Sequence, residues 1–284
     1  MQLRVYGALL IALNAGAQGL QPAPGLNLNS IEKEAALGAQ LAQNMGQKTT
    51  VIESVAIRDY VEGIGRQLAA QLPNLPFTYT FTVIADDIGG HTHEPLPLPA
   101  GYIFVPAGLI LAAQNETEFA GMLAHAMAHV AERHSLRQAV GIVQTKGASI
   151  PLVFISGWMA MGSGDGDYAA VPMSFLTISR EFEIEADALA IKMMVGAAYD
   201  PEALVQYISR VQPEDTDASK IFSALPSRAS RIAAMEQAIH DLPTKSYIAA
   251  DEFYRVQAEL RRLLPNQVRQ PPSLLRPNEN TEGH

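Results

Sequence analysis

Two histidines four residues apart are the side chains in this sequence best suited to hold a metal ion. His125 and His129 lie in the stretch ETEFAGMLAHAMAHVAERHSLRQ, residues 116–138. Apolar residues recur there at helical spacing, which predicts one long helix with a core-facing stripe. Residues four apart leave the same face of a helix, so both imidazoles are placed to bind one divalent cation, most often zinc. Two packed histidines on a core helix are the alternative interpretation.

A zinc site needs a third protein ligand, and a second predicted helix offers a carboxylate. Within SREFEIEADALA, residues 179–190, Glu183 and Asp187 are also four apart and share a face. We expect Glu183 to reach the metal. Asp187 would accept a hydrogen bond from a ligand imidazole and so fix the tautomer of that ring. Glu181 and Glu185 are interpreted as part of a solvated acidic face.

The elements that must position these side chains are mostly helices, so the predicted fold class is α+β and mainly helical. Alternating Thr, Phe and Tyr predict a strand at residues 77–85, and a second strand is predicted at 102–105. The proline-containing residues 86–99 are expected to form a loop. Helices are predicted at 30–45, 51–72, 116–138, 179–197, 228–240 and 249–264, with a short one after Gly108 and another beginning at Asp200-Pro201.

Composition narrows the function. The chain has 284 residues, is 48% hydrophobic and carries a formal net charge of −9. It can therefore bury one large core, and it lacks the basic field that would attract nucleic acid. There is no cysteine, which excludes disulfides, thiolate zinc sites and a cysteine nucleophile. The sequence does not indicate an oligomeric state.

Three segments fall outside the predicted helical core. Residues 1–17 read as a signal peptide with a cleavage site at Ala15-Gly16-Ala17, which predicts an exported protein, periplasmic or secreted; a buried N-terminal helix is the alternative. Residues 146–178 predict a buried helix and a mobile loop, with apolar runs too short to span a membrane and partial membrane contact as a lesser alternative. Residues 265–284 predict a disordered tail, which leaves 18–264 as the folded domain.

Several motifs, in order, resemble the HtpX/BepA-type zinc metallopeptidases, the family that includes the CAAX prenyl proteases. Besides the HxxxH and ExxxD pairs, GYIFVPAGLILAAQNETEFAGMLAH and SREFEIEAD followed by YDPEA match, and the resemblance covers about residues 28–242. It implies a zincin-like fold with a small β-sheet beside the active-site helix. Its edge strand, Tyr102, Ile103, Phe104 and Val105, would hold an extended peptide or unfolded protein segment.

The resemblance also assigns roles to the candidate residues. It makes His125, His129 and Glu183 the ligands of one zinc per chain, with Asp187 behind them, in a metallopeptidase-like domain of envelope protein quality control. The general base of the family's HExxH motif is replaced by Ala126. That glutamate moves a proton from the metal-bound water to the leaving amine, and loss of such a group typically costs on the order of 10²–10⁴ in rate. A non-catalytic peptide-binding or chaperone-like pseudopeptidase is the alternative function.

Further departures concern two loops. Leu225 stands where the family often has a histidine before a proline. The loop GGHTHEPLPLPAG adds His91 and His93, interpreted as an exposed pair rather than as ligands, and leaves open whether His93 or Glu94 takes over proton transfer. Several departures favour a natural pseudopeptidase over one engineered substitution. A helical scaffold with coincidental histidines stays a third hypothesis.

Overall fold

A computed structural model of the chain describes residues 31–72, 75–85, 93–137, 152–155, 169–172, 180–212, 226–240, 242 and 252–264. The signal peptide predicted at 1–17, the tail predicted at 265–284, and both His91 and Leu225 lie outside the described residues.

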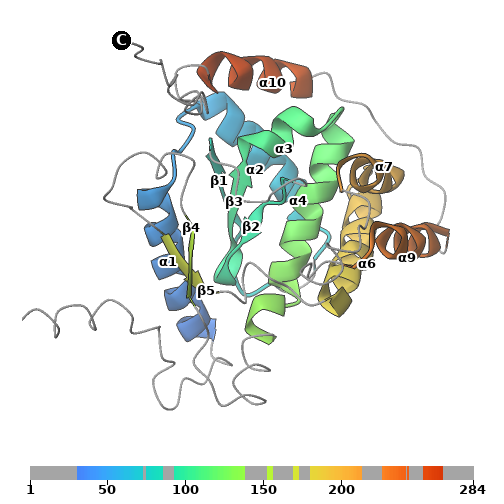
Figure 1. Ribbon diagram of the computed structural model, residues 1–284, viewed down its shortest axis with the longest axis horizontal. Coiled ribbons are helices and arrows are strands. Elements are labelled where there is room, and N and C mark those ends of the chain that lie inside the picture. The colour runs from blue at the N-terminus through green and yellow to red at the C-terminus, as the bar shows by residue number, and fades with distance from the viewer. Residues whose placement is uncertain are drawn as a thin grey trace, which may run out of the picture.

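Helices dominate the fold, which confirms the predicted α+β, mainly helical class (Figure 1). The helices are α1 (Ile31–Lys48), α2 (Val55–Ala69), α3 (Ala107–Ala112), α4 (Glu116–Ala131), α6 (Arg180–Gly196), α7 (Glu202–Val211), α9 (Arg228–His240) and α10 (Glu252–Leu263). The strands are β1 (Thr80–Ile84), β2 (Leu96–Pro97), β3 (Tyr102–Pro106), β4 (Leu152–Ile155) and β5 (Ala169–Pro172), and the 3-10 turn η2 (Pro99–Gly101) joins β2 to β3.

The three-stranded sheet has the order β1-β3-β2, with β1 parallel and β2 antiparallel to β3. The prediction that Tyr102–Val105 is an edge strand is therefore wrong, because β3 is paired on both sides. Within the described part of the chain the outer strand on that side is β2. It was predicted as loop because of its prolines. Leu98 donates its N–H to the Tyr102 carbonyl at 2.7 Å. In an antiparallel pair the backbone groups of the preceding residue, Pro97, then point away from β3, so the missing N–H of this proline costs no hydrogen bond between the strands.

Helix α4 runs through the middle of the molecule, between the sheet and the layer formed by α6, α7 and α9 (Figure 1). Thirteen of its residues, from Glu118 to Val130, are buried, as expected for a helix packed on all sides. At Gly121 an added Cβ would lie 3.1 Å from Leu204 Cβ and 3.2 Å from Met194 Cε, so a larger side chain would force the neighbouring helices to give. The interior of the molecule thus surrounds the histidine pair.

Both ends of α4 are set by single residues. Asn115 is the N-cap, and its Oδ1 accepts a hydrogen bond from the Glu118 N–H at 2.9 Å. The helix ends at Ala131 and not at 138 as predicted, because Arg133 takes a φ of 54°, in the left-handed region. The chain turns there, and residues 134–137 are again helical.

Two further findings concern segments away from the sheet. The buried helix expected within 146–178 is wrong at residues 152–155, which form β4 and pair antiparallel with β5. Val153, Phe154 and Ile155 are β-branched or aromatic, and such residues favour strands. Among the described helices, none has the length and apolarity required to cross a membrane.

Candidate metal centre

The structure brings the three predicted ligands together at the contact between α4 and α6. The Nε2 atoms of His125 and His129 are 3.0 Å apart. Glu183 lies 3.5 Å from His125 Nε2 through Oε2 and 3.6 Å from His129 Nε2 through Oε1. Among the described residues, His125, His129 and Glu183 form a group whose donor atoms all lie within 4.8 Å of one another.

This geometry fits a tetrahedral metal ion. With metal–nitrogen bonds of 2.0–2.1 Å, neighbouring ligand atoms in a tetrahedron are about 3.3 Å apart, close to the observed separations. The three residues are between 2% and 5% exposed. Glu183 Oε2 is buried and receives no hydrogen bond from the described residues. Because a buried polar atom without a partner is costly, the unpaired Glu183 oxygen is consistent with a place for a metal ion.

Asp187 takes the predicted position behind the first histidine. Its Oδ1 lies 2.8 Å from His125 Nδ1. The Nε2 atom of His125 therefore faces His129 and Glu183 while Nδ1 is held by a carboxylate, the usual arrangement behind a metal-binding imidazole.

Arg231 was not found by sequence reasoning, although it completes this arrangement. It projects from α9 and is fully buried. Its Nε and Nη2 each donate a hydrogen bond of 2.8 Å to the two Asp187 oxygens, so the pair is bidentate. Its Nη1 also donates to Gln212 Oε1 at 3.3 Å and to Glu94 Oε1 at 3.4 Å. The Arg231–Asp187–His125 chain thus ties three helices to one imidazole.

The charges of these groups follow from burial and from their partners. Burial alone would raise the pKa of Asp187, but Arg231 outweighs it and holds that pKa well below its usual value. Burial would lower the pKa of His125, yet Asp187 raises it to about 10 in the metal-free protein. Burial and the charge of His125 lower the pKa of His129 to about 3. One positive charge, the extra proton of His125, is thus favoured in the metal-free protein. A bound metal cation would replace this proton between the two imidazoles.

The remaining candidates do not belong to the group of metal-binding donors. Ala126 is 1% exposed on α4, directly beside His125 in the chain, and offers only a methyl group. His93 packs against Gly108 at the start of α3, where an added Cβ would lie 2.6 Å from its Nδ1. Glu94 borders the site through Arg231, and burial together with the charge of Glu183 raises its pKa.

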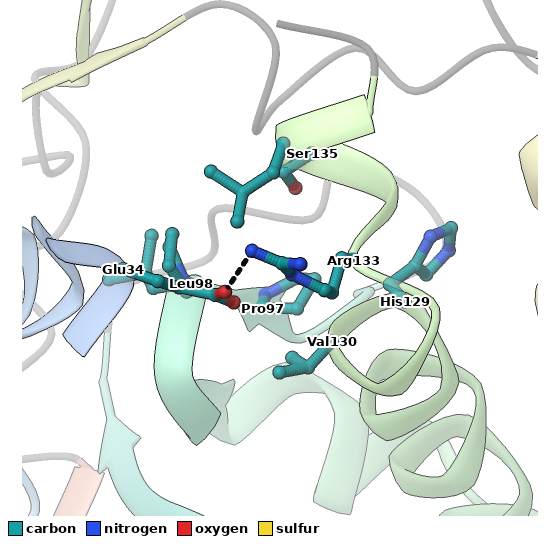
Figure 2. Close-up of a pocket in the computed structure, with 9 residues that line it drawn as sticks. Glu34, Pro97, Leu98, His129, Val130, Arg133 and Ser135 are labelled. Carbon is teal, nitrogen blue, oxygen red and sulfur yellow. Dashed lines mark ion pairs between the residues drawn. The ribbon is translucent and has the colours of Figure 1, made fainter. Parts of the chain in front are cut away.

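A small pocket adjoins the second histidine (Figure 2). It lies between the end of α4, the β2–η2 segment and α1, with His129 at one side. Pro97, Leu98 and Val130 give it an apolar wall. Arg133 Nη2 and Glu34 Oε2 form an ion pair of 2.7 Å within it, drawn as the dashed line in Figure 2. Of the three proposed metal ligands, His129 is the one that lines this pocket.

Comparison with known proteins finds similar proteases. The chain is 21% identical over 239 residues to the beta-barrel assembly-enhancing protease of Escherichia coli K12, a match that covers 81% of this chain and 48% of that protein. It is 24% identical to the Yersinia pestis protein of the same name, over 74% of this chain and 46% of that protein. A match to the mitochondrial metalloendopeptidase OMA1 of Schizosaccharomyces pombe is 29% identical over 160 residues, 54% of this chain and 46% of that protein.

The matches show how much of each relative this chain covers and to which family it belongs. The chain spans about half the length of the curated relatives it matches. The model of peptidase family M48 matches residues 59–239, well over half of the chain, and this range contains every residue of the His125–His129–Glu183 cluster and its Asp187–Arg231 support. The chain therefore belongs to peptidase family M48.

Proposed function

We propose that this protein is a zinc-dependent metalloendopeptidase-fold protein of envelope protein quality control whose peptide-bond hydrolysis is strongly impaired by Ala126. The observation that carries this proposal is the meeting of three buried donors, His125, His129 and Glu183, beside a methyl group where the reaction needs a proton carrier. The pattern of residues 1–17 supports export to the periplasm or outside the cell. The bacterial relatives are named beta-barrel assembly-enhancing proteases, which supports a role in protein assembly at the envelope.

The residues of this chain can hold a metal ion firmly, but they lack the side chain that would carry the proton. A zinc ion held by the three ligands would polarise the scissile carbonyl and activate water. Asp187 holds His125 by its Nδ1 atom, and Arg231 keeps Asp187 ionised. The methyl side chain of Ala126 can neither accept nor donate a proton, so the transfer to the leaving amine is the step that we expect to be slow.

The peptide is proposed to lie along β2 and not along Tyr102–Val105. Those four residues belong to the inner strand β3. The Pro97 carbonyl faces away from β3. Because both residues of β2 are buried, a peptide that adds to this strand must first displace the side chains that cover it.

A non-catalytic peptide-binding or chaperone-like pseudopeptidase is the second candidate, favoured by Ala126 itself. The experiment that separates the two compares wild type, Ala126→Glu and Ala126→Gln. Glutamine has the size of glutamate but cannot accept the proton, so it is the matched control. For the first candidate, Ala126→Glu gains chelator-sensitive casein cleavage of roughly 10²–10⁴-fold over Ala126→Gln.

The second candidate predicts a different pattern. Ala126→Glu would bind zinc yet cleave no faster than Ala126→Gln, and labelled unfolded casein would still bind to His125→Ala. If neither the wild type nor Ala126→Glu retains a metal after dialysis against zinc, both the site and the proposed function are wrong.

A further inference from the structure

His134 is a buried histidine that neither the family motif nor the ligand set uses. It follows the turn at Arg133, and its side chain is fully buried. Its Nδ1 atom lies 2.9 Å from Nδ1 of His129. On a continuous helix a residue five positions on would point about 140° away, so this contact exists because the left-handed Arg133 redirects the chain.

The short distance between these two nitrogens fixes their protonation pattern. Two N–H groups facing each other at 2.9 Å would repel, so one nitrogen donates and the other accepts. Nε2 of His129 faces His125 and Glu183, and it can bind a cation only through its lone pair. The His129 proton therefore lies on Nδ1 and is donated to His134 Nδ1.

The remaining contacts of His134 agree with this assignment. With Nδ1 as acceptor, its own proton lies on Nε2, which is 3.4 Å from Glu185 Oε2, an ion-pair contact that does not meet hydrogen-bond geometry. Arg137 in turn holds Glu185 with Nη1 at 3.1 and 3.2 Å from the two oxygens. The His134 ring stacks on Phe182, with centroids 4.6 Å apart and an interplanar angle of 7°. Phe182 and Glu185 flank Glu183 on α6, so the helix that carries the third ligand also orients His134.

We propose that His134 is a positioning residue for the metal centre, which accepts the His129 Nδ1 proton and so keeps Nε2 of that ligand free and correctly aimed. The inference rests on the proposed metal site. The two ligand histidines are then supported differently, His125 by a carboxylate and His129 by a second imidazole. Removing a partner of this kind typically lowers metal affinity 10–100-fold.

The test compares zinc affinity in wild type, His134→Leu and His134→Asn, measured by competition with a chromogenic chelator. Leucine fills space without an acceptor, whereas asparagine places its Oδ1 near the position of the lost Nδ1. We expect the zinc Kd of His134→Leu to rise 10–100-fold, and that of His134→Asn to stay within about threefold of wild type. Val256→Ala, a buried truncation on α10, is the control for lost stability alone and should leave the zinc Kd unchanged.

A second readout does not depend on any variant folding. In the zinc-loaded wild type, long-range proton–nitrogen NMR of the imidazoles should show His129 protonated at Nδ1 and His134 at Nε2. The opposite tautomer at either ring, or a His134→Leu protein that binds zinc as tightly as wild type, would overturn the inference while leaving the metal site intact. A wild type that binds no zinc would instead remove the proposed site together with the inference.

Discussion

The pair formed by Arg231 and Asp187 should be the most costly single interaction to break in this protein. Both side chains are at most 1% exposed, and two hydrogen bonds of 2.8 Å join them. Replacing Arg231 with methionine keeps the apolar bulk but removes both guanidinium hydrogen bonds from the buried Asp187 carboxylate, which keeps only His125 as a charged neighbour among the described residues. Removing one partner of a buried ion pair costs about 3–5 kcal/mol.

That cost is a large part of the stability of an ordinary domain, which is roughly 5–15 kcal/mol. For a domain of this size, each kcal/mol lowers Tm by about 2–4 °C. We therefore expect Arg231→Met to melt about 6–20 °C below wild type, measured by circular dichroism in the metal-free protein. Arg66→Met is the matched control: Arg66 pairs with Glu62 at 3.5 Å on the exposed face of α2, and its loss should leave Tm unchanged within error.

A double variant separates lost pairing from lost packing. Arg231→Met combined with Asp187→Leu removes both charges, and replacement of a buried pair by apolar residues is often neutral or stabilising. The double variant should therefore recover most of the lost Tm, while zinc binding stays weak because His125 has lost its Asp187 partner. If the Tm changes of Arg231→Met and Asp187→Leu, each measured alone, simply add in the double variant, the reasoning about this pair is refuted. A Tm of Arg231→Met within 2 °C of wild type would refute it as well.

Three other predictions test the metal and the packing around it. A chelator should lower Tm, because zinc at about 100 times its Kd adds roughly 2.7 kcal/mol to the folded state, and calorimetry with and without EDTA measures this; an unchanged Tm would count against the site. Within α1, Gly38→Ala should destabilise by about 1–3 kcal/mol, since its Cβ would lie 2.1 Å from the Pro99 carbonyl oxygen. Gly46→Ala, with nothing within 4 Å, should stabilise by about 0.5–1 kcal/mol, and denaturant titration that ranks the two the other way would contradict the α1–η2 packing. Burial and the hydrogen bond to Glu116 raise the pKa of Tyr60, so the stability that its neutral hydroxyl adds to the folded state is complete below the unfolded pKa of about 10 and is lost as pH rises above it. Tyr60→Phe should therefore reduce the fall in unfolding free energy between pH 10 and 11 by about 1 kcal/mol. If denaturant titration gives both proteins the same alkaline slope, this reasoning is refuted.

The sequence was most informative where chemistry follows local spacing. His125 and His129, and likewise Glu183 and Asp187, are each four apart on a helix, so the face they share could be predicted before any tertiary structure was known. The start predicted at residue 116 is confirmed, since α4 begins at Glu116. That the two helices meet depends on core packing, and here the prediction rested on resemblance to a family.

The features that the sequence missed depend on backbone exceptions or on distant packing. Pro97 made β2 look like a loop, although a proline whose nitrogen faces away from the neighbouring strand is compatible with pairing. The left-handed turn at Arg133 moved His134 from the far side of a predicted helix to the back of His129. Arg231 reads as an ordinary basic residue on a polar helix, and only the packing of α9 against α6 reveals its partner.

The metal content of the purified protein tests the central claim most directly. X-ray fluorescence or plasma emission analysis after dialysis against zinc should give about one zinc per chain for wild type and close to none for a His129→Ala, Glu183→Ala double variant that remains folded. A wild type without bound metal, or a double variant that keeps its full zinc content, would show that His125, His129 and Glu183 do not form a metal centre.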